Sequence, residues 1–113
     1  MISHKKYIDI AIKLAEKGRG HVSPNPLVGC IIVKRGKIVG RGYHKKYGEE
    51  HAEINALKAA GKKANNATMY VNIEPCSHWG KTSPCTEKIV EAGIREVVVG
   101  IEDPNPLVDG YKE

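Results

Sequence analysis

Four side chains in the middle of the chain carry the chemistry of a zinc-dependent active site. They are one imidazole, two thiols and one carboxylate, supplied by His51, Cys76, Cys85 and Glu53. Catalytic zinc sites take three protein ligands and leave a fourth position for water. A carboxylate beside that water can move protons to and from it. The pattern therefore predicts one zinc ion held by His51, Cys76 and Cys85, with water or hydroxide as its fourth ligand. Glu53 would be the proton shuttle.

Each part of this pattern also has a simpler explanation. His51 alone could cap a helix or lie on the surface, and the two Pro-Cys pairs could be ordinary buried thiols. A structural zinc site is a further alternative, but it needs a fourth protein ligand. The candidates by residue type are His4, His21, His44 and His78, and no spacing selects one of them. A structural site would also leave Glu53 without a role, so the joint pattern favours the catalytic interpretation.

The hydrophobic pattern predicts the elements that position these side chains. Helices are expected over residues 3–17, 50–60 and 83–92, and strands over residues 27–33, 38–43, 68–73 and 96–101. The first two strands are joined by a tight turn and should form a β-hairpin. The whole order predicts an α/β fold with one mixed sheet and helices packed on its faces.

Two of the three predicted zinc ligands fall at helix starts. His51 lies at the start of the second predicted helix and Cys85 at the start of the third. The positive end of a helix favours a thiolate over a thiol. Residues two apart on a helix point in different directions, so His51 and Glu53 can serve one ion only near the helix end. Cys30, inside the apolar run of the first strand, is expected to be a buried, inert thiol.

The composition indicates the size and the cellular compartment of the protein but does not indicate a binding partner. The chain has 113 residues, a hydrophobic fraction of 41% and a net charge of +5, with its lysines and arginines scattered. It should form one domain. No apolar run approaches the about 20 residues of a membrane span, and residues 1–20 lack the apolar core of a signal peptide. A cytoplasmic protein is therefore expected, in which cysteines bind metal more often than they form disulfides.

Four segments resemble a known enzyme family. They are Ser-Pro-Asn-Pro-Leu-Val-Gly-Cys at 23–30, His-Ala-Glu-Ile-Asn-Ala-Leu at 51–57, Glu-Pro-Cys-Ser-His-Trp-Gly-Lys-Thr-Ser-Pro-Cys at 74–85 and Asp-Pro-Asn-Pro-Leu-Val at 103–108. They are similar to the pyrimidine deaminase of riboflavin biosynthesis, the deaminase part of a bifunctional deaminase-reductase in the cytidine deaminase-like superfamily. Zinc deaminases share His-x-Glu followed by Pro-Cys-x-x-Cys. Here eight residues separate the two cysteines instead of two, and this long spacing is the most discriminating feature.

The resemblance implies a fold, a reaction and further site residues. The fold would be the three-layer α-β-α arrangement of cytidine deaminases. The reaction would be hydrolytic deamination of a diamino-ribosylamino-pyrimidinone 5′-phosphate to the corresponding uracil derivative, with release of ammonia. Asn25 and His44 resemble residues that line the pyrimidine pocket of the family. Lys81 falls where the family contacts the phosphate end of the substrate.

The family's deaminase domain usually continues past Gly110 into another helix and strand, and a reductase domain often follows. This sequence stops at Glu113. We therefore expect a single zinc-dependent deaminase domain over residues 1–113, truncated at its C-terminal end and without the reductase domain. An exposed sheet edge would favour self-association, and a homo-oligomer (dimer or tetramer) is expected. Whether the chain is a natural short form or a fragment stays open.

Two alternative functions remain at this stage. The same zinc chemistry could act on a nucleoside or a tRNA base, but that would call for a concentrated basic groove with stacking aromatic side chains. The scattered lysines, one Trp and five Tyr give little support to it, so a nucleic-acid partner is not expected. The other alternative is a non-catalytic module in which zinc only holds the fold together.

Overall fold

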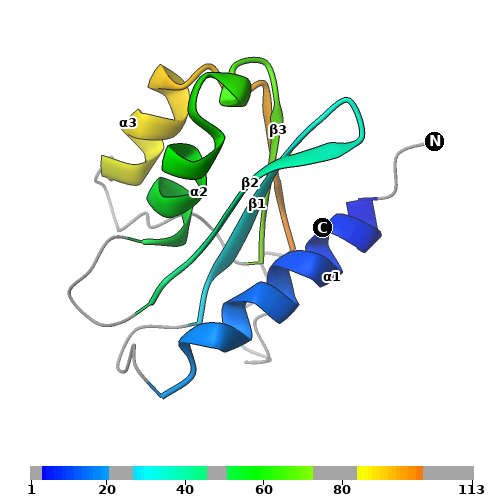
Figure 1. Cartoon of the computed structure of the whole chain (residues 1–113), viewed down its shortest axis with the longest axis vertical. Helices are drawn as coiled ribbons and strands as arrows, with labels where there is room; N and C mark the ends of the chain where they lie inside the picture. The colour runs from blue at the N-terminus through cyan, green and yellow to red at the C-terminus, as the bar shows by residue number, and fades with distance from the viewer. Residues whose placement is uncertain (1–3, 21–26, 46–50, 73–83, 101–113) are drawn as a thin grey trace, which may run out of the picture.

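The computed structural model describes residues 4–20, 27–45, 51–72 and 84–100, which form three layers (Figure 1). The helices are α1 (His4–Ala15), α2 (Ala52–Ala60) and α3 (Pro84–Glu91), and the strands are β1 (Gly29–Lys34), β2 (Lys37–Tyr43), β3 (Thr68–Val71) and β4 (Glu96–Val99). Figure 1 shows α1 on one face of the sheet and α2 and α3 on the other. The predicted order of elements and the three-layer arrangement are confirmed.

The four described strands form one mixed sheet in the order β2-β1-β3-β4. Strand β1 is antiparallel to both β2 and β3, whereas β3 and β4 are parallel. The predicted hairpin is β1–β2, and its two turn residues Arg35 and Gly36 both have positive φ, at 53° and 79°. Two positive φ values are what a type I′ hairpin turn requires. The mixed sheet expected from the order of elements is thus confirmed.

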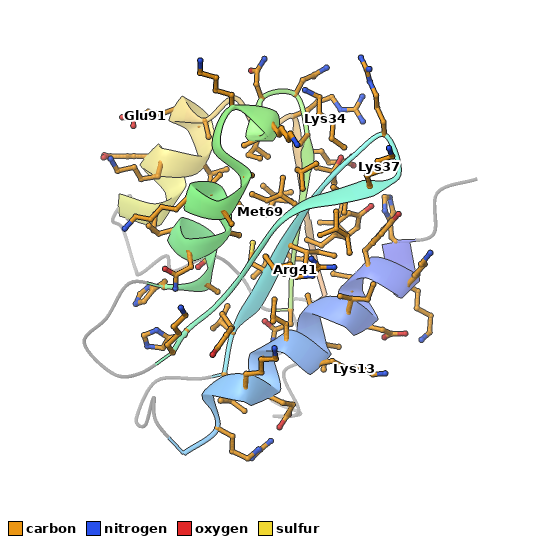
Figure 2. The ribbon with its side chains drawn as sticks, viewed as in Figure 1. Lys13, Lys34, Lys37, Arg41, Met69 and Glu91 are labelled. Atoms are coloured by element: carbon orange, nitrogen blue, oxygen red, sulfur yellow. The ribbon has the colours of Figure 1, made fainter. Side chains whose placement is uncertain are left out.

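Side chains of the central strands alternate between two hydrophobic cores, as the pleat of a strand requires. Cys30 and Ile32 of β1 pack on the α2–α3 side with Met69 of β3, which Figure 2 labels beside α2. Ile31 and Tyr70 pack on the α1 side. Because β1 is buried on both faces, its sequence reads as a continuous apolar run.

Helix α2 lies unusually close to β2 because two glycines of the strand face it. A Cβ at Gly40 would lie 2.6 Å from the carbonyl oxygen of Ala56, and a Cβ at Gly42 would meet the carbonyl oxygen of Ala52. Glycine inside a strand often marks such a close approach of another backbone. The start of α2 is therefore seated directly on the end of β2.

The predicted elements differ from the observed ones mainly at their ends. The third and fourth strands end at Val71 and Val99, two residues before the predicted limits, and α2 begins at Ala52 rather than at residue 50. Short 3₁₀ turns, Glu16–Gly18 and Gly61–Ala64, extend α1 and α2. Among the described helices, none is both long enough and apolar enough to cross a membrane.

Candidate functional site

His51 is the N-cap residue of α2, so the predicted position of this histidine at a helix start is confirmed. Its φ and ψ are −77° and 168°, and its carbonyl oxygen accepts a hydrogen bond from the Asn55 N–H at 3.1 Å. The imidazole makes no capping hydrogen bond to the helix. The ring is half-buried. The capping explanation therefore does not account for this side chain.

Glu53 lies in the first turn of α2 and is almost completely buried, with a relative exposure of 1%. A carboxylate is rarely buried to this degree unless it has polar partners or a chemical role. The positive end of the helix stabilises its negative charge. The geometry thus places a buried acid two residues from the half-buried imidazole of His51.

Cys30 lies close enough to Glu53 to feel its charge. Burial raises the pKa of the Cys30 thiol well above its ordinary value, and the negative charge of Glu53 raises this pKa further. The thiol therefore stays protonated over the physiological range. Cys30 is fully buried in the α2–α3 core, so its predicted burial is confirmed.

His44 reaches the same site from the end of β2. Its side chain is buried, with 2% exposure, and its ring meets that of His51 edge to face, with centroids 5.0 Å apart. Its backbone N–H donates to the carbonyl oxygen of Val28 at 3.1 Å. Beside it, the Asn55 side-chain amide donates to the carbonyl oxygen of Tyr43 at 3.0 Å. These bonds tie the start of α2 and the segment before β1 to the end of β2.

Asn72 is a polar residue of this region that the sequence reasoning missed. It follows β3 directly and is only 8% exposed. Its Oδ1 accepts a hydrogen bond from the Gly29 N–H at 2.8 Å, and its Nδ2 donates to the Leu27 carbonyl oxygen at 3.1 Å. Asn72 therefore clamps the segment that leads back along the sequence to Asn25. A polar residue directly after an apolar strand was the available signal.

The remaining predicted site residues fall partly or wholly outside the described residues. Asn25, Cys76 and Lys81 lie outside them, and for Cys85 only the backbone, at the second position of α3, is described. Within the described part of the chain, no three potential metal ligands come together. Helices α2 and α3 lie side by side with their starts toward the same end of the sheet (Figure 1). The backbone placement of Cys85 at a helix start agrees with the prediction.

The available donors suit zinc better than a harder metal ion. One imidazole nitrogen with two thiolates is a ligand set typical of zinc, whereas magnesium and calcium prefer oxygen. The His51 imidazole, which does not cap α2, and the buried carboxylate of Glu53 two residues later fit a site with one ligand and one proton carrier at the same helix end. The chemistry of these residues is therefore compatible with a zinc ion.

Comparison with known sequences gives one family and several close relatives. Residues 1–101 match the family described as the cytidine and deoxycytidylate deaminase zinc-binding region. The chain is 56% identical over 104 residues to the diaminohydroxyphosphoribosylamino-pyrimidine deaminase of Buchnera aphidicola, covering 92% of this chain and 71% of that protein. It is 55% identical over 106 residues to the riboflavin biosynthesis protein RibD of Aquifex aeolicus, covering 94% of this chain but only 30% of that protein.

Comparison with solved structures also finds a RibD protein and a deaminase-reductase. RibD of Acinetobacter baumannii superposes with a TM-score of 0.81 at 48% identity, over 93% of this chain and 30% of that one. The deaminase-reductase of Thermotoga maritima gives a TM-score of 0.79 at 48% identity, over 92% and 31% of the two chains. A cyanophage dCMP deaminase shares the fold, with a TM-score of 0.68 at 22% identity. The cytidine deaminase-like fold expected from the sequence is confirmed.

Proposed function

The chain belongs to the cytidine and deoxycytidylate deaminase zinc-binding family, and on this premise we propose that it deaminates the diamino-ribosylamino-pyrimidinone 5′-phosphate of riboflavin biosynthesis. Water adds to the amino-bearing ring carbon, the C–N bond breaks, and ammonia and the uracil derivative are released. The names of the Buchnera and Aquifex relatives support this substrate. The chain spans 71% of the Buchnera protein but less than a third of the Aquifex protein, so the proposal concerns the deaminase reaction alone.

The zinc ligands in this proposal are His51, Cys76 and Cys85, with one ion per chain. When bound, zinc supplies a water molecule whose pKa is lowered to about 7, so that hydroxide is available near neutral pH. The role of the chain is to hold the ligands in place. The contact of His44 with the His51 ring and the seating of α2 on Gly42 would fix the orientation of the imidazole.

Glu53 is the proposed proton carrier, and its burial is the observation that carries the proposal. Its carboxylate would take a proton from the attacking water and deliver it to the ring nitrogen, and would then carry the proton of the newly added hydroxyl group to the departing amine. A side chain with 1% exposure at a helix start is shielded from bulk water, which favours transfer to the substrate over exchange with solvent. A purely structural zinc module would not require a proton carrier at this position.

Substrate binding is assigned to three residues, of which two precede the zinc ligands in the sequence and one lies between the two cysteines. Asn25 and His44 would contact the pyrimidine, because an amide and an imidazole can donate to and accept from the edge of a heterocycle. Lys81 would bind the 5′-phosphate as a positive charge. Of these three residues, only His44 lies among the described residues, and it is buried against His51.

The choice of substrate is tested by ammonia release from a panel of amines. Zinc-loaded protein should release ammonia from the diamino-ribosylamino-pyrimidinone phosphate, and cytidine, dCMP and a tRNA substrate should be inert. Lys81→Ala should raise KM for the phosphorylated pyrimidine and leave KM for its dephosphorylated form unchanged. Preference for cytidine, dCMP or tRNA would overturn the substrate assignment. An equal loss on both pyrimidines would overturn only the role of Lys81.

The proposal also covers the cellular compartment and the oligomeric state of the protein. We infer a cytoplasmic homo-oligomer, a dimer or tetramer, in which residues 1–113 act as one deaminase domain. The edge strands β2 and β4 of the described sheet offer backbone groups through which two copies could pair. Light scattering coupled to size-exclusion chromatography measures the assembly, and a monomer at micromolar concentration would contradict it.

A further inference from the structure

A hollow of about 440 Å³ opens at the end of the sheet opposite the candidate site. Its rim carries Lys34, Arg35 and Arg95, and its floor includes Thr68 and Tyr70. In the register of the hairpin, Lys34 pairs with Lys37, whereas Gly29 at the other end of β1 pairs with Tyr43, next to His44. The hollow and the candidate site are thus separated by the length of β1. Its volume falls in the range of small-molecule sites.

The rim of the hollow is strongly cationic. No aspartate or glutamate is among its lining residues. No salt bridge involves Lys34, Arg35 or Arg95 within the described part of the chain. The carboxylate of Glu96 lies close enough to Tyr70 to raise its pKa, an effect added to the larger one of burial, but Glu96 does not line the hollow. Several positive side chains around one hollow, with no acidic residue in its lining, favour an anionic ligand.

Arg35 occupies a backbone position that disfavours its residue type. It has φ of 53° at the first central position of the hairpin turn, where Asn, Asp or Gly is preferred. The other described non-glycine residue with positive φ, Asn66 at 64°, lines the same hollow. Asn adopts such a φ readily, so Arg35 is the strained position of the two, and a strained position is often retained where its side chain is needed for binding. The turn does not explain why an arginine stands at position 35, whereas binding of a ligand in the hollow does.

The floor is ordered and can contact the non-ionic part of a ligand. Tyr70, 2% exposed, packs its ring against Tyr7 with centroids 5.0 Å apart, and its hydroxyl is 2.7 Å from Nδ1 of His4. The Tyr7 hydroxyl donates to the Gly36 carbonyl oxygen at 3.3 Å, which ties α1 to the turn that presents Arg35. These contacts hold the cationic rim over an aromatic floor.

We propose that this hollow binds a small phosphorylated molecule, with its phosphate on Lys34, Arg35 and Arg95. Arginine matches the geometry of phosphate oxygens with paired N–H donors, and the Thr68 hydroxyl offers a further donor. A hollow of this size suits a small molecule better than a polynucleotide, which needs an extended basic track. The site is independent of the zinc chemistry proposed above.

The test uses phenyl phosphate as the probe, because it combines a phosphate with an aromatic ring. It is titrated into zinc-loaded full chain at low salt, and amide shifts are followed by NMR. Saturable shifts at Arg35, Gly36, Thr68 and Arg95 are expected. Arg35→Asn keeps a favoured hairpin turn while removing the charge, and it should weaken binding about fivefold. Arg95→Gln should act similarly.

Lys13→Asn is the matched control, because it removes one exposed positive charge from the later part of α1, far from Lys34 and Lys37 (Figure 2). It should leave the dissociation constant unchanged. Equal weakening of probe binding by Lys13→Asn and Arg35→Asn would show that binding depends only on the overall positive charge, and would overturn the proposal. Amide shifts that do not saturate would overturn it as well. Shifts confined to residues around His44 and His51 would place the probe in the candidate active site, and would also overturn it.

Discussion

The rings of His44 and His51 pack edge to face, with centroids 5.0 Å apart and planes inclined by 83°. One residue follows β2 and the other caps α2, so the contact joins two elements that the close approach of Gly42 to the start of α2 already holds together. In the proposed site, a residue of the pyrimidine pocket thereby supports a zinc ligand. Metal-bound histidines are usually oriented by such neighbours.

Substitution of His44 separates its two proposed roles. His44→Phe keeps an aromatic ring against His51 but cannot hydrogen-bond the pyrimidine, so it should retain zinc and raise KM about tenfold. His44→Ala also removes the ring contact and should lower zinc affinity by about tenfold or more. Steady-state kinetics and metal analysis of both variants measure these effects. A wild-type KM in His44→Phe would remove His44 from the substrate pocket.

Asn72 is expected to support both stability and substrate binding. Asn72→Ala leaves the buried Gly29 N–H and the Leu27 carbonyl without the amide partner, which should lower the free energy of unfolding by about 2 kcal/mol. Because Leu27 is two residues from Asn25, KM should rise as well. Urea unfolding and kinetics measure the two effects.

Thr68→Ala is a suitable control for Asn72→Ala, because Thr68 is similarly buried at the other end of β3. It should alter stability without changing KM. If Asn72→Ala changes stability alone, the clamp does not act on the substrate pocket. If neither quantity changes, the two hydrogen bonds do not contribute to the folded state.

The raised pKa of Cys30 predicts a pH-dependent contribution to stability. The unfolded thiol loses its proton at about pH 8.5, whereas the folded thiol, buried and near Glu53, loses it at higher pH. The contribution of Cys30 is therefore fully present below about pH 8.5 and is lost as the pH rises toward the folded pKa. The difference in unfolding free energy between the wild type and Cys30→Ala should shrink between about pH 7 and about pH 10. A constant difference would contradict the raised pKa.

Local patterns predicted the elements of this chain better than they predicted its contacts. The apolar run around Cys30 correctly indicated a buried strand, and His51 before an alanine-rich segment correctly marked a helix start. The pairing of β1 with β3 joins residues about 40 apart in the sequence, and no local pattern specifies such a pairing. The end of β3 was misplaced because the strand stops at Val71, where the Asn72 side chain bonds the backbone of residues 27 and 29.

The residue types assigned to the zinc site stay a prediction, and the contacts that support His51 and His44 could not be predicted from the sequence. His51 and Glu53 indicated this chemistry only together with Cys76 and Cys85, because a histidine near a helix start has simpler explanations by itself. Gly42 went unnoticed, although two glycines separated by one residue in a strand are a sign of close packing on that face. The contact of His44 with His51 depends on the helix–strand distance, which only the tertiary structure provides.

Glu53→Gln tests whether Glu53 carries the protons of a zinc-dependent deamination. Zinc content and the rate of ammonia release from the pyrimidinone phosphate are measured together, with Glu91→Gln as an exposed control of equal charge change. Glu53→Gln should keep its zinc and lose about a thousandfold in kcat, because glutamine has the shape of glutamate but cannot carry the proton. Glu91→Gln should match the wild type. Undiminished ammonia release from zinc-bound Glu53→Gln would show that Glu53 is not the proton carrier.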